Sequence, residues 1–253
     1  MMKAFMKYLL AFVIINTCLS PLASQVLEEI NRDITITCHV VRGSEQELVD
    51  TAALREEIVK LNTACEKIKL SFSYDLRIVE NSNLHSILDF DIRLKDLMAQ
   101  SYQPNTLNIY FVGIIPNDTA DYYMDNSASR DFILIRKKSY EKEGVFIEYV
   151  GKFFDLYNTH ESEANGPELV DRSAGCATTG DLCCDTPADP NLEGLVSMSC
   201  LYIGTERDLN GERYIPTVAN YMSNSPYMCR CKFSDQQLIR MMNFIKTNKN
   251  YFW

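Results

Sequence analysis

Residues 148–160 concentrate side chains whose types and spacing could support chemistry. Glu148 and Lys152 lie four residues apart, so on a helix they share one face and form an ion pair worth about 0.2–0.5 kcal/mol when exposed. Asp155 lies on the same face. Tyr149 cannot act as a general base, because a phenol with a pKa of about 10 stays protonated at neutral pH. The stretch therefore predicts electrostatic pairing rather than general-base catalysis.

Histidine, a frequent zinc ligand, is scarce in this chain. The three histidines are His39, His85 and His160. His39 falls in a predicted strand and His85 in a polar loop, so only His160 can join the group at 148–160. A three-histidine zinc site is therefore hard to build, and we interpret all three as surface or hydrogen-bonding residues.

An acidic loop downstream offers a second group of polar side chains. Asp181, Asp185 and Thr186, with Asp189 nearby, present the oxygen ligands that Ca²⁺ prefers. Asp side chains also cap turns in loops of this kind. Both interpretations stay open, so a structural calcium ion at this loop is one hypothesis and turn capping is the other.

The segment EYVGKFFDLYNTH, residues 148–160, resembles the H-E-x-G-H-x-x-G-L-Y-H-T-H motif of the pappalysin family of metzincin zinc metalloproteases. In that family the first two histidines lie one helical turn apart and bind Zn²⁺, the glutamate activates the metal-bound water, and a third histidine follows a glycine turn. Every catalytic side chain is replaced in this chain. The corresponding positions hold Glu148, Tyr149, Lys152, Asp155 and Asn158.

Three later segments support the resemblance. Residues 180–190, GDLCCDTPADP, resemble the G-D-x-x-x-D-T-P segment of the family. Residues 220–223, NYMS, resemble its N-x-M turn, the Met-turn. Cys229 and residues 233–237 match the C-x-x-x-F-T-x-x-Q stretch that follows. Upstream of this region the likeness is only in the order of the elements.

The resemblance places Met222 beneath the metal and makes the substitutions informative. Lys152 carries a protonated ammonium group, which repels a dication where the family has an imidazole. Asn224 stands where many relatives carry a tyrosine that steadies the oxyanion. We therefore expect zinc to be absent and the oxyanion role to be lost.

Eight cysteines follow the predicted leader, and an even number in an oxidising compartment predicts disulfides. By resemblance, Cys176 pairs with Cys200. A second bridge joins Cys184 to Cys229 on the same ground. A cysteine-only metal site is the alternative, but the vicinal and C-x-C pairs lack the usual C-x-x-C ligand spacing. The connectivity stays open for Cys38, Cys65, Cys183 and Cys231.

Residues 1–24 have the pattern of a signal peptide. Lys3 and Lys7 supply a basic start, and residues 8–15 form an apolar run too short to span a bilayer. We therefore expect secretion or delivery to the periplasm. A lipoprotein anchored at Cys18 is the alternative.

Composition is that of a globular protein, with 46% hydrophobic and 23% charged residues. The net charge of −9 argues against a nucleic-acid partner, because no basic patch could neutralise phosphates. We expect no transmembrane segment. The mature chain, 25–253, is long enough for one domain with an upper lobe at about 25–158 and a lower lobe at about 159–253.

Periodicity predicts an α/β upper lobe. Residues 34–41 and 70–78 alternate apolar and polar side chains, which is typical of strands. Residues 54–68 carry the apolar stripe of an amphipathic helix. Residues 107–115 and 132–135 are continuous apolar runs, as in strands covered on both faces.

We therefore predict an α/β (α+β) fold of metzincin type. It has a twisted, mixed and mostly parallel sheet, two long helices and a loop-rich C-terminal lobe held by disulfides. The second helix carries residues 148–155 and buries a stripe that runs from Phe146 to Tyr157. Clusters of Gly, Pro, Asn and Asp beyond Asn158 predict irregular structure.

Two functional hypotheses follow. The first is an exported pseudoprotease that binds a peptide, a protein or another ligand in the former substrate cleft. The second is an active zinc metalloendopeptidase with an altered ligand set, in which His160 acts with Glu148, Asp155 or Glu161. The sequence determines neither the partner nor the oligomeric state.

Overall fold

The computed structural model describes residues 27–42, 49–81, 90–113, 115, 122–125, 131–140, 144–171 and 175–252. The predicted signal peptide, Cys18 and His85 lie outside these ranges. No helix within them is long and apolar enough to cross a membrane.

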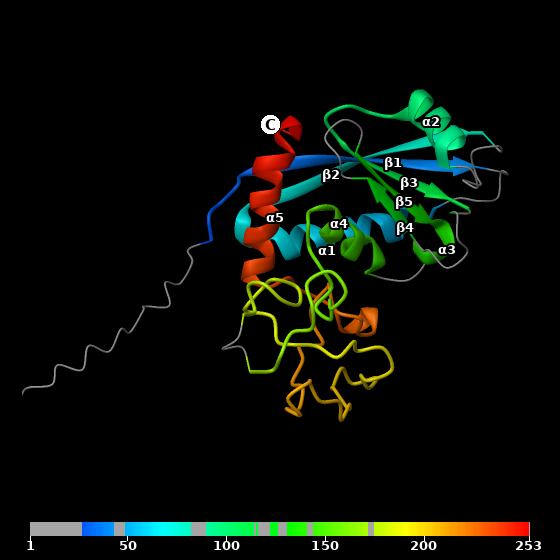
Figure 1. Cartoon of the computed structure of the whole chain (residues 1–253). Coiled ribbons are helices and arrows are strands. Elements are labelled where there is room, and N and C mark those ends of the chain that lie inside the picture. The colour runs from blue at the N-terminus through cyan, green and yellow to red at the C-terminus, as the bar shows by residue number, and fades with distance from the viewer. Residues whose placement is uncertain are drawn as a thin grey trace, which may run out of the picture.

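A five-stranded sheet forms the upper half of the molecule (Figure 1). Its order is β2-β1-β3-β5-β4, and all neighbouring pairs are parallel except β4 with β5. This confirms the predicted mixed, mostly parallel sheet, and four of its strands lie at the predicted positions. The strands are β1 (Arg32–Arg42), β2 (Leu70–Glu80), β3 (Leu107–Val112), β4 (Tyr122–Asp125) and β5 (Phe132–Arg136).

Helices cover both faces of the sheet (Figure 1). Side chains of α1, α4 and α5 share one hydrophobic cluster with one sheet face, and Leu97 and Met98 of α2 pack against the other. Asp50 caps α1, because its side chain accepts from the N–H groups of Ala52 and Ala53. The helices are α1 (Thr51–Cys65), α2 (Phe90–Ser101), α3 (Lys137–Tyr140), α4 (Val145–Phe153) and α5 (Asp235–Asn248), with short 3₁₀ turns η1 (Glu66–Ile68), η3 (Tyr227–Cys229) and η4 (Asn250–Phe252).

Helix α4 carries the segment that resembles the zinc motif. It begins after Gly144, whose φ of 80° suits glycine and whose N–H donates to the buried Glu57 of α1. Phe146 and Phe153 are buried as predicted. The helix ends earlier than the predicted stripe, so Tyr157 lies beyond it and is only half-buried.

Helix α5 returns to the sheet after the irregular lower half (Figure 1). A capping box of Ser234 and Gln237 starts it, and its buried face joins the hydrophobic cluster of the sheet. Residues 235–252 therefore belong to the upper half in space, although we predicted a lower lobe of about 159–253. The irregular part, which we call the lower half, comprises residues 159–234.

Two disulfides hold the lower half. Cys176 bonds to Cys184 with a Cα–Cα distance of 5.0 Å, and Cys200 bonds to Cys229 with 5.5 Å. The four expected cysteines are all used, but the predicted partners, Cys176 with Cys200 and Cys184 with Cys229, are wrong. A turn whose Thr178 N–H donates to the Gly175 carbonyl precedes Gly180 and brings Cys184 back beside Cys176. The other four cysteines carry no disulfide: Cys38, Cys65, Cys183 and Cys231.

Candidate functional site

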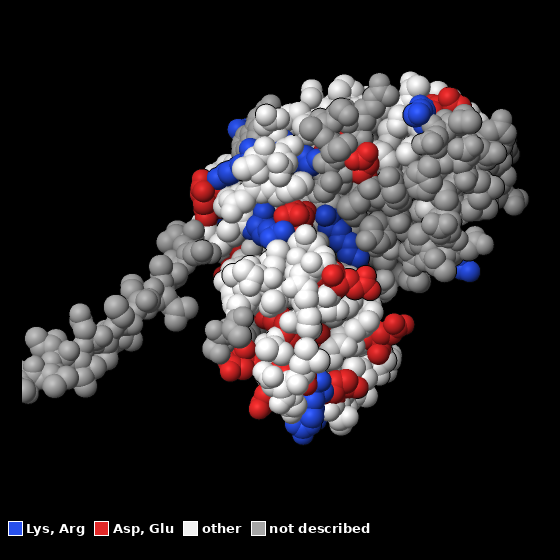
Figure 2. All heavy atoms as spheres, viewed as in Figure 1, with Lys and Arg blue, Asp and Glu red and all other residues white. Residues whose placement is uncertain are grey.

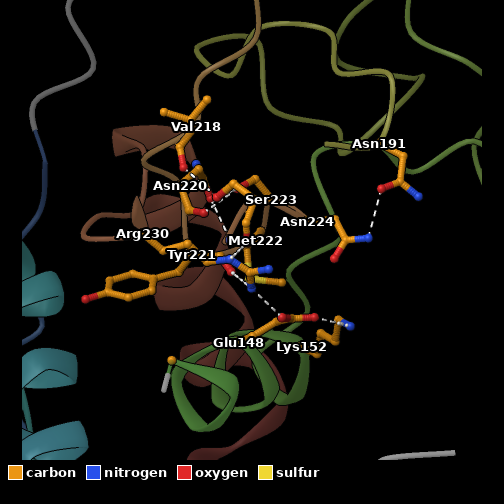
Figure 3. A network of polar contacts seen from close by, with 12 residues as sticks. Glu148, Lys152, Asn191, Val218, Asn220, Tyr221, Met222, Ser223, Asn224 and Arg230 are labelled. Carbon is orange, nitrogen blue, oxygen red and sulfur yellow. Dashed lines mark hydrogen bonds and ion pairs between the residues drawn. The ribbon is translucent and has the colours of Figure 1, made fainter. Parts of the chain in front are cut away.

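The Met-turn lies directly against helix α4 (Figure 3). A Cβ added to Gly151 would stand 2.8 Å from the Met222 sulfur, so only glycine allows this approach. The Asn220 side chain shapes the turn, because its Oδ1 accepts from the Met222 N–H at 2.8 Å. Its Nδ2 donates to Gln237 of α5 at 2.8 Å. The turn is therefore held against both helices.

Glu148 lies between two cations at this contact (Figure 3). Its Oε1 is 2.7 Å from Lys152 Nζ, and its Oε2 is 2.7 Å from Arg230 Nη1. The predicted pairing of Glu148 with Lys152 is confirmed, but the pair is not exposed. The Glu148 and Lys152 side chains are 14% and 15% exposed, and Arg230 is 2% exposed.

Arg230 is a site residue that sequence reasoning missed. It lies 82 residues from Glu148, so no helical or strand spacing connects the two. Its Nε donates to the Ser225 carbonyl at 2.8 Å, and its guanidinium carbon lies 4.2 Å from the centre of the Tyr227 ring. The one available signal was its place after Cys229, within a matched segment.

Asn158 and His160 line a cavity of about 570 Å³ beside the Met-turn. The cavity wall also includes Glu161, Asn191 and Tyr214. Within the described residues, Asn158 Oδ1 and His160 Nδ1 are buried without a hydrogen-bond partner. Burial and the nearby Lys152 ammonium lower the pKa of His160, so its ring is neutral at pH 7.

Thr159 forms the wall of this cavity toward the Met-turn. Its N–H donates to the Met222 carbonyl at 3.0 Å, and its hydroxyl donates to Asp189 Oδ2 at 2.7 Å. Asn191 continues this wall and accepts from Asn224 Nδ2 at 2.8 Å. The Asn224 side chain thus hydrogen-bonds to Asn191, and it carries no phenol where the resemblance expects a tyrosine.

The residues present do not fit zinc. No group of three His, Cys, Asp or Glu side chains is placed to hold a metal ion among the residues that the structure describes. Both oxygens of Glu148 contact cations, and Asp155 Oδ2 pairs with Arg240 at 2.6 Å. Tyr149 is buried in the core at 4% exposure. The carboxylates of Glu148 and Asp155 are therefore already paired with cations, and Tyr149 is part of the hydrophobic core.

The acidic loop is organised by its own hydrogen bonds. Asp181 accepts from the Thr186 hydroxyl at 2.9 Å, from the Cys183 N–H at 3.0 Å and from Gln237 Nε2 at 3.3 Å. Burial nevertheless raises the pKa of Asp181 to about 6. Asp185 accepts from an N–H in the first turn of α5 at 2.8 Å. The aspartates considered for calcium thus act as caps and turn acceptors, and the Thr186 hydroxyl is a donor to Asp181.

Comparisons with known proteins identify the fold. No protein-family model and no characterised protein sequence matches the chain. Mirolysin, solved in complex with a compound, is similar in structure with a TM-score of 0.55 and 15% identity, over 87% of this chain and 94% of mirolysin. Metalloproteinase-II from Bacteroides fragilis aligns with a TM-score of 0.41 and 9% identity, over 86% of this chain and 54% of that one. The likeness to mirolysin shows a metalloprotease-like, metzincin-like fold.

Proposed function

We propose that this chain is an exported, catalytically inactive relative of pappalysin-type zinc metalloendopeptidases that binds a peptide or protein in the former substrate cleft. The observation that carries the proposal is the set of three charged side chains at the Met-turn: Glu148, Lys152 and Arg230. Glu148 is held by Lys152 and Arg230 where the resemblance expects an imidazole and a metal. A dication approaching this position meets two fixed cations and no imidazole from α4.

The backbone supports the pappalysin-type frame even though the side chains differ. Asp155 occupies the motif's glycine position and has a φ of 69°, a region that favours glycine. Gly151 keeps the close approach to Met222. Both features support the proposal that the motif keeps its backbone geometry while its ligands are replaced.

The cavity beside the Met-turn supports the binding role. Its wall is mostly polar and includes Asn158, His160 and Glu161. A peptide amide supplies both a donor and an acceptor, so it can pair with polar side chains of this wall. A volume of about 570 Å³ has room for more than one side chain.

The first test is the zinc content of the recombinant mature chain. After incubation with excess zinc and dialysis, we expect far less than one zinc per chain by elemental analysis and no cleavage of a mixed peptide library, because the three positions of the motif's histidine ligands carry Glu148, Lys152 and Asn158. The paired variant His160→Ala should give the same values. One zinc per chain that disappears in His160→Ala, or cleavage that a chelator abolishes, would establish the altered-ligand protease instead.

A second arm of the same experiment addresses binding. Immobilised peptides from the library should retain the native chain. They should retain an Asn158→Ala/His160→Ala variant at least about tenfold more weakly, because the cavity then loses two of its polar side chains. Asn210→Ala, an exposed change in the lower half, is the matched control. Equal retention by all three proteins would remove the cavity from the proposal.

A further inference from the structure

Arg230 is almost completely buried, with 2% of its side chain exposed. A buried cation is stable only where carboxylates or carbonyl oxygens replace its water. Arg230 meets that need with Glu148 Oε2 at 2.7 Å, the Ser225 carbonyl at 2.8 Å and the Tyr221 carbonyl at 3.5 Å. The Tyr227 ring lies 4.2 Å from the guanidinium carbon.

These contacts join two separate parts of the molecule (Figure 3). Glu148 belongs to α4, whereas Tyr221 and Ser225 flank Met222 on either side. The guanidinium therefore connects the motif helix to both sides of the Met-turn. Lys152, the second cation on Glu148, belongs to α4 itself and makes no such connection through that carboxylate.

We infer that the Arg230 guanidinium links α4 to the Met-turn in place of a metal ion, and that its positive charge prevents a metal from binding there. The inference rests on the proposed function only for the positions of the former zinc ligands. A guanidinium stays protonated at any physiological pH, so the link is permanent and independent of metal supply.

The link can be measured in the native chain. Arg230→Gln should lower the melting temperature by roughly 6–12 °C, because it leaves Glu148 without its most buried partner. The double variant Glu148→Gln/Arg230→Gln should lose less melting temperature than the sum of the two single losses, since it removes both members of the buried Glu148–Arg230 pair. Lys232→Gln, an exposed lysine two residues away, is the control and should melt like the native chain. Strict additivity of the two single variants would overturn the link.

The exclusion of metal is tested by restoring imidazoles. The triple variant Glu148→His/Lys152→His/Asn158→His leaves the buried Tyr149 and the turn at Asp155 unchanged. It is prepared with Arg230 and with Arg230→Gln, and zinc affinity is measured by competition with a chelating dye. We expect at least about tenfold tighter zinc binding in the Arg230→Gln version, because a unit positive charge beside a dication is removed.

The outcomes separate the two proposals. Equal zinc affinity in the two versions, or no zinc in either, overturns the inference that Arg230 prevents metal binding. It leaves the proposed function of the native chain untouched. Stoichiometric zinc in the native chain overturns the proposed function. Should the triple variant fail to fold by circular dichroism, the melting cycle of Glu148 and Arg230 in the native background decides the inference by itself.

Discussion

At the scale of single residues, buried titratable groups govern how stability depends on pH. Asp181 is 1% exposed, and burial raises its pKa from 3.8 to about 6. Because folding raises this pKa, the contribution of Asp181 to stability is fully present below pH 3.8 and is lost as pH rises through about 6. The free energy of unfolding changes by about 3 kcal/mol over this range. His39 is fully buried, and burial lowers its pKa from 6.5 to about 4. Its contribution has the opposite sign: it is present above pH 6.5 and is lost as pH falls through about 4.

The two contributions oppose each other between pH 4 and 6.5. Removing one of the two groups should therefore make the pH dependence of the other visible. Asp181→Asn should lose stability toward acid more steeply than the native chain, by up to about 3 kcal/mol across this interval. His39→Gln should gain relative stability toward acid by a similar amount. Urea unfolding at half-unit pH steps measures both, with Glu56→Gln, an exposed change on α1, as control. Parallel curves for all four proteins would contradict the assignment.

At the scale of elements, the two disulfides divide the lower half into separately closed loops. Cys176 and Cys184 are 8 residues apart, whereas Cys200 and Cys229 are 29 residues apart and tie a loop to η3. The second bridge ends one residue before Arg230. It therefore positions the segment that carries the cation at the Met-turn.

Peptide mapping without reduction should recover Cys176 linked to Cys184 and Cys200 linked to Cys229. Replacing Cys200 and Cys229 by Ser should cost about 3–4 kcal/mol of unfolding free energy, and replacing Cys176 and Cys184 about 2–3 kcal/mol, because the longer loop loses more chain entropy when it is closed. Chemical denaturation of the two double variants gives the comparison. A linked peptide containing Cys176 and Cys200 would show that the pairing is wrong.

At the scale of the whole molecule, the charge distribution restricts the partner. Residues 159–234 contain eleven acidic and five basic residues, a net charge of −6 within the −9 of the chain. Figure 2 shows mostly acidic side chains among the charged residues on the lower half in this view. A polyanion such as a nucleic acid would be repelled from this surface.

Metal removal should leave the molecule intact, because its halves are joined by protein contacts. Helix α5 and the sheet share one hydrophobic cluster, and Arg230 links α4 to the Met-turn. We expect the melting temperature in 5 mM chelator, an amount on the order of a hundred times the protein, to match that in buffer with added zinc or calcium within about 1 °C. Differential scanning calorimetry measures this. A fall of several degrees in chelator, reversed by calcium, would point to a cation at the acidic loop.

Local patterns in the sequence determined most of the upper half. Strands β1 and β2 follow from alternation, and β3 and β5 follow from apolar runs, because a strand's side chains report its burial residue by residue. The pairing of Glu148 with Lys152 was also predictable from local spacing, since one helical turn separates the two residues.

Only the tertiary structure decided the contacts between distant segments. Arg230 reaches Glu148 across 82 residues, and the disulfide partners depend on turns that bring cysteines within bonding distance. The sequence left calcium binding and turn capping open for Asp181. Its hydrogen bonds to Thr186 and Gln237 favour capping. Such contacts form when separate elements pack together, and packing leaves no periodic signal along the chain.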